Sequence, residues 1–307
     1  MTTQRSKPIC GIDAKSRPWF TMALGVLSVL WFSSGGTTGL AAESHRILVV
    51  GHGPEQPVIQ ELARAYEKRH PGTVIDIEWD RVLDTVAMVK SGQADLAVTG
   101  QRDPELRAAQ VAWDGIAVIV NFANPLSEVT TDQVRALFSG EVQRWSSFEG
   151  SDARVELIRR TPDQNIDSGF EESLGIVGKM PESSKPARSD QKTLASVSGK
   201  DNAVSYISLK AALDAQGLGI PIRILTIDKV EPGEPTVKEG RYKLRRPVLF
   251  LSRKEAHPLV DSFTAFAQSA EGQAILSKMY TAYTPPPNQP KEAKPRDSNA
   301  PEAKQAS

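Results

Sequence analysis

The chain has 307 residues and a mass of 33.4 kDa, and its 37 basic and 37 acidic residues give a formal net charge of zero. Apolar residues make up 39% and charged residues 24% of the chain, as in soluble globular proteins, which argues against wholesale disorder and against a polytopic membrane protein. The balanced charge also argues against a nucleic-acid partner, because such proteins carry a basic surplus.

Residues 1–42 have the pattern of a cleavable signal peptide. Basic residues precede an uncharged, mostly apolar run at 19–32, and small residues at 39–42 follow where a signal peptidase reads. A membrane anchor is the alternative, but the run is short for a span of about 20 residues. We therefore expect cleavage and a periplasmic location. Cleavage would remove Cys10, the single cysteine, so neither a disulfide nor a zinc cluster is expected.

Strands and helices are predicted to alternate after the signal peptide. The β-branched run 46–51 predicts a buried strand, and apolar residues from Pro57 to Tyr66 recur at helical spacing until Pro71-Gly72. The elements expected next are a strand at 73–79, a helix at 82–90, and strands at 94–98 and 115–120.

The alternation starts again past Pro125. A helix is expected at 131–138, with Thr130 or Thr131 as its N-cap. Further elements are expected as strands at 155–158, 203–207, 223–227 and 247–251, and as helices at 168–174, 209–216, 259–267 and 271–280. This order predicts an α/β fold with parallel sheets, and the restart suggests two lobes. Residues 285–307, rich in proline and polar residues, are expected to form a disordered tail.

No motif in the sequence predicts catalysis. A Gly-x-Ser-x-Gly elbow, a His-Glu-x-x-His pair and a phosphate-binding Gly-x-x-x-x-Gly-Lys loop are all missing. His52, which lies between two glycines after a strand, is the best candidate for reactivity. No paired acid is identifiable, so a loop residue near a pocket is the favoured interpretation. We expect a protein that is not an enzyme and that holds no cofactor or metal.

Several predicted loops suit the binding of an oxyanion. Gly51-His52-Gly53 joins a strand to a helix, and glycines let backbone N–H groups approach a ligand. Thr99-Gly100-Gln101-Arg102 follows another strand, and Ser168-Gly169 opens a predicted helix. Arg159 and Arg160 end a strand, and arginine suits bidentate capture of an oxyanion.

Several blocks of the sequence, in order from about residue 46 to 284, resemble one family, the periplasmic phosphate-type substrate-binding proteins of ABC transporters (type II periplasmic binding proteins). The blocks are Gly92-Gln93-Ala94-Asp95-Leu96, Trp113-Asp114-Gly115 with the apolar run to Asn121, Asn124-Pro125, Leu137 to Trp145, Gly240 to Pro247, and Phe263-Thr264-Ala265-Phe266 with Glu271-Gly272-Gln273. The resemblance implies two α/β lobes joined by a two-strand hinge that close over a ligand. Lobe 1 is expected at 46–120 plus 224–284 and lobe 2 at 121–223.

The ligand loops depart from the pattern of that family. Where it has Gly-x-Gly-Thr, this chain has Gly53 followed by Pro54-Glu55, and Glu55 would repel an anion if it pointed inward. The second loop, around Arg81, has no glycine, and the third aligns either at 163–165 or at Ser168-Gly169. The candidate ligand residues are Gly53, Glu55, Arg81, Thr99, Arg102, Arg160, Asn165 and Ser168.

The leading hypothesis is therefore an exported monomeric protein that captures phosphate or a related small oxyanion for a permease in the inner membrane. The alternative is an envelope sensor or accessory binding protein on the same fold that has lost phosphate uptake. A hydrolase is a weaker third hypothesis, because no nucleophile with a base is visible.

Overall fold

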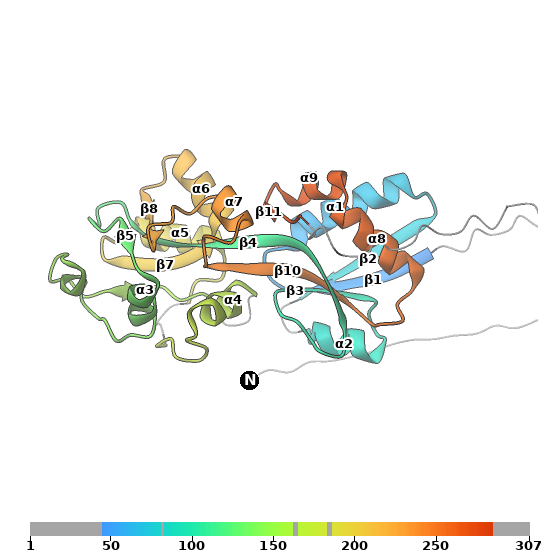
Figure 1. Cartoon of the computed structure of the whole chain (residues 1–307), viewed down its shortest axis with the longest axis horizontal. Coiled ribbons are helices and arrows are strands. Elements are labelled where there is room, and N and C mark those ends of the chain that lie inside the picture. Colours follow the sequence, from blue (N-terminus) through green and yellow to red (C-terminus); the bar gives the residue numbers. More distant parts are fainter. Residues whose placement is uncertain (1–44, 81–82, 162–164, 183–185, 285–307) are drawn as a thin grey trace, which may run out of the picture. The chain divides into compact units, whose positions relative to one another are not determined.

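The computed structural model of the protein describes residues 45–80, 83–161, 165–182 and 186–284. The predicted signal peptide, the predicted tail and the candidate residue Arg81 lie outside these ranges. The strands are β1 (His45–Gly51), β2 (Thr73–Trp79), β3 (Leu96–Thr99), β4 (Arg107–Asn121), β5 (Glu128–Val129), β6 (Glu156–Leu157), β7 (Ala203–Ser208), β8 (Ile222–Ile224), β9 (Thr226–Ile227), β10 (Arg245–Ser252) and β11 (Thr281–Ala282). The helices are α1 (Gln56–Arg69), α2 (Thr85–Ser91), α3 (Thr131–Phe138), α4 (Asn165–Leu174), α5 (Asp190–Ser198), α6 (Leu209–Gly217), α7 (Glu234–Lys238), α8 (Pro258–Gln268) and α9 (Ala270–Leu276), with a 3₁₀ turn at Trp145–Phe148 (Figure 1).

The main sheet is mixed, with the strand order β2-β1-β3-β10-β4-β7-β6. Strand β1 runs parallel to β2 and β3, and β6 runs parallel to β7, whereas β10 is antiparallel to both of its neighbours and β4 is antiparallel to β7 and β8. The predicted α/β class is confirmed, but the prediction of parallel sheets is wrong. The reason is that β10 returns from the C-terminal part of the chain and enters the sheet between β3 and β4.

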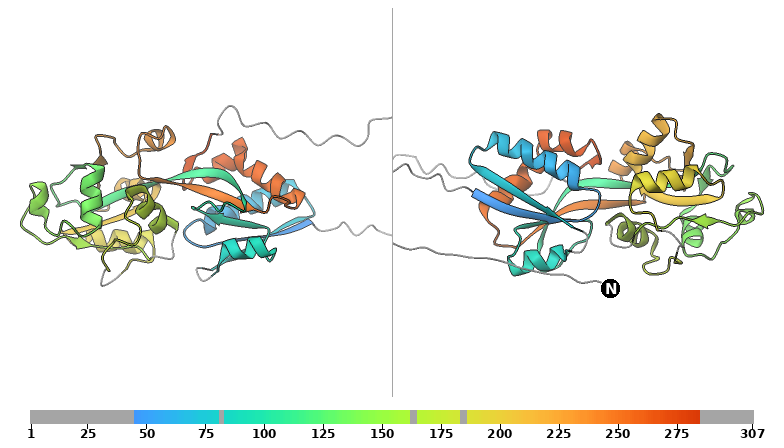
Figure 2. Two further views of the ribbon diagram at one scale, coloured as in Figure 1. Left: turned by 60° about the horizontal axis from the view of Figure 1, so that its bottom comes forward. Right: turned by 180° about the vertical axis from the view of Figure 1, so that it is seen from behind.

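The first part of the sheet is buried on both faces. Ile47 and Val49 of β1 pack in a cluster with apolar residues of α1, α8 and α9, whereas Val50 packs on the other face with Val89 of α2. Figure 2 shows α2 on the opposite side of these strands from α1. A continuous β-branched run is what burial on both faces requires, and this explains why residues 46–51 read as a buried strand.

A second hydrophobic cluster contains residues from Ile116 to Leu244. Phe170 of α4 stacks on Tyr206 of β7 with 3.9 Å between the ring centroids, and Phe138 of α3 meets both rings edge to face. Helix α3 begins with a capping box at Thr130, one of the two predicted N-caps.

Strand β4 belongs to both clusters, whereas the buried apolar residues of β10 pack with the first part of the sheet. On β4, Ala112 packs in the first cluster and Ile116 in the second, and on β10 Val248 packs in the first. Residues 225–244 pack in the second cluster because β8 pairs with the second half of β4. The second cluster thus includes Leu225, Val237 and Leu244, and the predicted lobe boundaries stay a prediction.

The helices within the described ranges include none that is long and apolar enough to cross a membrane.

Candidate functional site

A buried ion-pair cluster lies at the start of β10 and at the point on β4 between the residues of the first and the second hydrophobic cluster. Arg246 of β10 donates from Nε and Nη2 to Asp114 Oδ2 of β4, at 3.1 and 2.9 Å, and from Nη2 to Glu55 Oε1 at 2.6 Å. The Ser208 hydroxyl donates to Asp114 Oδ1 at 2.8 Å. Glu55 and Asp114 are both 0% exposed and Arg246 is 2% exposed. One guanidinium thus faces two carboxylates in surroundings that exclude water.

Burial and mutual charge shift the ionisation of this cluster. Burial raises the pKa of Asp114 to about 6, although Arg246 and the Ser208 hydroxyl oppose the shift. Burial alone would lower the pKa of Arg246, but the carboxylates of Glu55 and Asp114 outweigh it and raise that pKa above its ordinary value. Burial, followed by the same two negative charges, also raises the pKa of Tyr280 well above its ordinary value. Arg246 therefore stays charged, whereas the charged form of Asp114 is less favourable than that of an exposed aspartate.

The loop after β1 brings Glu55 into the cluster. Gly51 leaves room for the indole of Trp79, because a Cβ at Gly51 would lie only 2.3 Å from the ring. Trp79 Nε1 in turn donates to the Gly53 carbonyl at 3.1 Å. Gly53 has φ of +93°, which turns the chain so that Glu55 enters just before α1. Gly51 therefore serves packing, and the carboxylate that follows Gly53 is directed inward.

Helix α4 approaches the cluster from the other side. Asn165 Nδ2 donates to the His52 carbonyl at 3.2 Å and to Glu55 Oε1 at 3.3 Å. Gly169 packs directly on Arg246, since a Cβ there would lie 2.8 Å from the Cβ and Cδ atoms of the arginine. The Ser168-Gly169 pair therefore has a packing role at Gly169, and Ser168 is half-buried on the same helix.

Arg160 forms a neighbouring buried group. Its Nη1 lies 2.8 Å from Asp190 Oδ1 and donates to Thr193 Oγ1 at 3.0 Å, and the residue is 1% exposed. Burial raises the pKa of Asp190, Arg160 and Arg246 lower it, and Glu55 raises it further. These mutual effects place the two groups in one electrostatic environment.

Other predicted residues have different positions. Thr99 is buried, and its hydroxyl accepts a hydrogen bond from the Gln101 amide at 3.2 Å, which stabilises the turn after β3. Arg102 is exposed, unlike the buried residues of the cluster. His52 lies beside Asn165, as a loop residue near the site. The structure thus brings together Gly53, Glu55 and Asn165, with Arg160 adjacent, and leaves Arg102 outside.

Arg246 and Asp114, the centre of the cluster, and Asp190 are not among the site residues predicted from the sequence. Asp114 interrupts a strand whose next six residues, to Val120, are buried, and Arg246 directly precedes a buried apolar strand segment. Charged residues are almost never fully buried without a partner. An aspartate in one apolar strand and an arginine in another could therefore have been predicted to form a buried ion pair.

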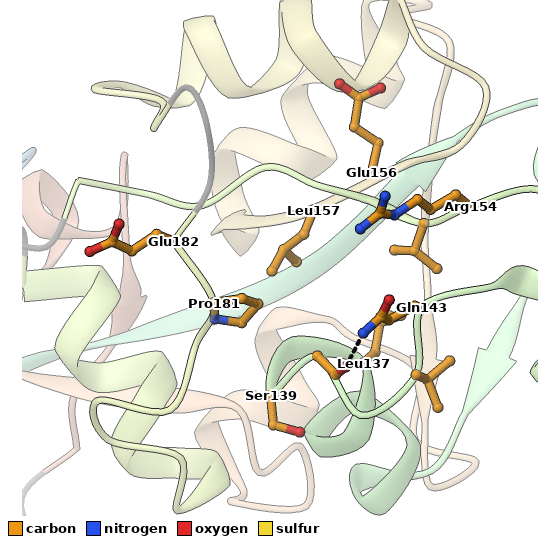
Figure 3. A pocket seen from close by; sticks show the side chains of 11 residues that line it. Leu137, Ser139, Gln143, Arg154, Glu156, Leu157, Pro181 and Glu182 are labelled. Atoms are coloured by element: carbon orange, nitrogen blue, oxygen red, sulfur yellow. Dashed lines mark hydrogen bonds between the residues drawn. The ribbon is translucent and has the colours of Figure 1, made fainter.

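A cavity separate from the ion-pair cluster lies among residues 137–182. The cavity, of about 600 Å³, is lined by residues of α3, the segment that follows it, β6 and the segment around Pro181. Figure 3 shows Leu137, Leu157 and Pro181 around the space, with Arg154 and Glu182 on different sides. Its Arg154 is accompanied by two carboxylates, Glu156 and Glu182. This surplus of acid makes it a poorer oxyanion site than the cluster at Arg246.

The fold and the position of the buried site define the periplasmic-binding-protein-like class, in which two α/β parts share crossing strands. The chain belongs to the family described as "PBP superfamily domain", whose model matches residues 36–271. The predicted family resemblance and fold are confirmed.

The chain is also similar to individual proteins that are named for phosphate binding or phosphate transport. The chain is 31% identical over 111 residues to the phosphate-binding protein PstS 2 of Streptococcus pneumoniae, an alignment that spans 34% of this chain and only 38% of that protein. It is 20% identical over 252 residues to the phosphate-binding protein PstS of Bacillus subtilis, which covers 80% of this chain and 82% of that protein. An ABC-type phosphate transport receptor from Vibrio cholerae has a similar fold, with a TM-score of 0.69 at 22% identity over 77% of this chain and all of the other.

Proposed function

We propose that the protein is an exported, periplasmic solute-binding protein that captures a small oxyanion, phosphate or a relative, and delivers it to an ABC permease. The names of the related proteins support this reading. The observation that carries the proposal is that one terminal nitrogen of the Arg246 guanidinium, Nη1, is available to a ligand. Its Nη1 is buried and has no hydrogen-bond partner among the described residues, and it lies near Gly100, where a Cβ would be only 3.3 Å away. A buried guanidinium nitrogen with unused donors is suited to an oxyanion.

Binding rather than catalysis explains this arrangement. The two lobes, in this proposal, close over the anion, and guanidinium and backbone N–H groups replace its water. Glycine at positions 53 and 100 keeps the backbone accessible to the ligand. The protein acts as a monomer and hands the anion to the permease when the lobes open.

Calorimetric titration of the purified protein with phosphate, sulfate, molybdate and tungstate tests the proposal. We expect saturable binding of at least one anion. Binding should be strongly weakened in Arg246→Lys, which keeps the charge but loses the planar fork of donors, and retained in Arg102→Lys, the exposed control. Flat heats for all four anions with the wild-type protein would remove the support for uptake.

One observation favours a second function. Glu55 places a carboxylate against the same arginine that an incoming anion would need. An envelope sensor or accessory binding protein that has given up phosphate uptake would tolerate such a group. Affinity capture from the envelope fraction separates the two: recovery of a permease supports uptake, and recovery of a receptor kinase supports sensing.

A further inference from the structure

We propose that the Glu55 carboxylate is a built-in competitor for Arg246: it holds Nη2, beside the unpartnered Nη1, so that an oxyanion engages both nitrogens of the guanidinium only when Glu55 is displaced. This inference rests on the proposed function, because it concerns the same site. It makes Glu55 the residue that sets affinity.

The first support is the way in which Glu55 is held. The residue stands at the N-cap of α1, a position where short polar side chains such as Ser, Thr, Asp and Asn accept hydrogen bonds from the first turn of the helix. The side chain makes no such capping bond. Its Oε1 instead accepts from Arg246 at 2.6 Å and from Asn165 at 3.3 Å. The carboxylate is thus bound as a ligand of the site, by a guanidinium and an amide.

The second support is the space that the carboxylate fills. Gly53 leaves a gap beside the loop, and Glu55 Oε2 lies 2.8 Å from where a Cβ at Gly53 would be. That oxygen is buried and has no hydrogen-bond partner among the described residues. A buried charged oxygen without a donor is costly, so the protein gains little from Oε2 in this position. The Glu55 carboxylate therefore has only one of its two oxygens hydrogen-bonded, which favours its displacement by a ligand.

The third support is the charge balance. The carboxylates of Glu55 and Asp114 both pair with the single guanidinium of Arg246. An oxyanion next to Arg246 would add a like charge beside Glu55. Like charges in contact at a buried site are strongly unfavourable. The wild-type protein should consequently bind oxyanions much more weakly than the free donors of Arg246 would allow.

The test compares phosphate binding by calorimetry in the wild type, Glu55→Gln and Glu55→Ser. Gln keeps the size of the side chain and its contact with Asn165 but removes the charge, and Ser removes the obstruction as well. Asp114 still pairs with Arg246 in both variants. Glu78→Gln, on the exposed side of β2, removes the same charge elsewhere and is the matched control. We expect phosphate affinity to increase by about tenfold or more in the Glu55 variants and to stay unchanged in the control.

Each outcome separates the inference from the proposed function. If the wild type binds phosphate at least as tightly as both Glu55 variants, the inference is overturned and the proposed function stands. If the variants bind and the wild type does not, the inference is supported and the uptake role gives way to the accessory role. If neither the wild type nor any folded variant binds any of the four oxyanions, both ideas fail. A circular dichroism spectrum of each variant establishes that it is folded.

Discussion

Arg246 and Asp114 are register partners on the antiparallel strands β10 and β4, and their side chains form an ion pair with 2.9 Å between Nη2 and Oδ2. The pair links two segments that lie 132 residues apart in the sequence. Since β4 takes part in both hydrophobic clusters and β10 in the first, the pair lies where the two strands leave the first cluster, and it helps to fix their register.

Removal of the guanidinium should be severe for stability. Arg246→Met leaves Glu55 and Asp114 buried without their cation, and breaking a buried pair in this way costs about 3–5 kcal/mol of the free energy of unfolding. Arg46→Met is the control, because Arg46 pairs with Asp76 at 3.0 Å on the exposed side of β1 and such pairs contribute about 0–1 kcal/mol. Urea denaturation measures both, and similar losses in the two variants would contradict the prediction.

Asp114 should make stability depend on pH. Burial raises its pKa from 3.8 to about 6 in the folded protein. The folded state therefore holds the extra proton between these values, and the contribution to stability is full below about pH 4 and is lost as the pH rises through 6. With about 1.4 kcal/mol for each pKa unit, the loss is about 3 kcal/mol. Asp114→Asn should flatten this part of the curve of unfolding free energy against pH, and Asp76→Asn should leave it as it is. A wild-type slope in Asp114→Asn would show that another group titrates.

The close approach of α4 to Arg246 predicts an unusual effect of alanine in a helix. Gly169→Ala gains about 1 kcal/mol of helix propensity but places a Cβ 2.8 Å from Arg246, and overpacking costs about 1–3 kcal/mol. We expect a net loss of stability. Gly217→Ala, at the end of α6 with no atom within 4 Å of the new Cβ, should be neutral or stabilising. The thermal unfolding temperatures of both variants test this prediction, and a Gly169→Ala variant more stable than the wild type would contradict the close contact with Arg246.

The packing of Gly51 against Trp79 can be tested by a double-mutant cycle. Gly51→Ala should destabilise the protein by about 1–3 kcal/mol, because the new Cβ meets the indole at 2.3 Å. In a Trp79→Leu background the same substitution should cost less, with a coupling energy of about 0.5–3 kcal/mol. Strict additivity in urea unfolding would mean that the two residues do not compete for space.

The sequence predicted those elements whose residues carry a strong local pattern. The helix at 131–138 has a side-chain cap at Thr130 and a stop at Gly140, and the structure shows the same bounds. The first half of β4 was missed, because Arg107 to Gln110 are polar or small and only half-buried. Helix α5 was missed as well, since Asp190–Ser198 buries only Thr193 and Val197 and therefore has weak periodicity.

The site was less predictable than the fold, for a physical reason. The loop glycines and Glu55 could be chosen from local sequence, but the partner that decides what Glu55 does, Arg246, lies 191 residues away. Neither the composition nor the spacing of the residues predicts a contact between two positions so far apart in the sequence. The antiparallel insertion of β10 does so, and strand direction is set by the path of the chain rather than by the residues of the strand.

The late position of β10 in the chain also has a consequence for biosynthesis. The first hydrophobic cluster joins residues 47–112 to residues 248–280, whereas the second is built from one continuous stretch. A nascent polypeptide can thus complete the second cluster while β3 still has an open edge, and it must keep that edge from pairing with other chains until its last segment emerges. Premature termination before residue 245 would leave that edge permanently unpaired, and the truncated product should aggregate.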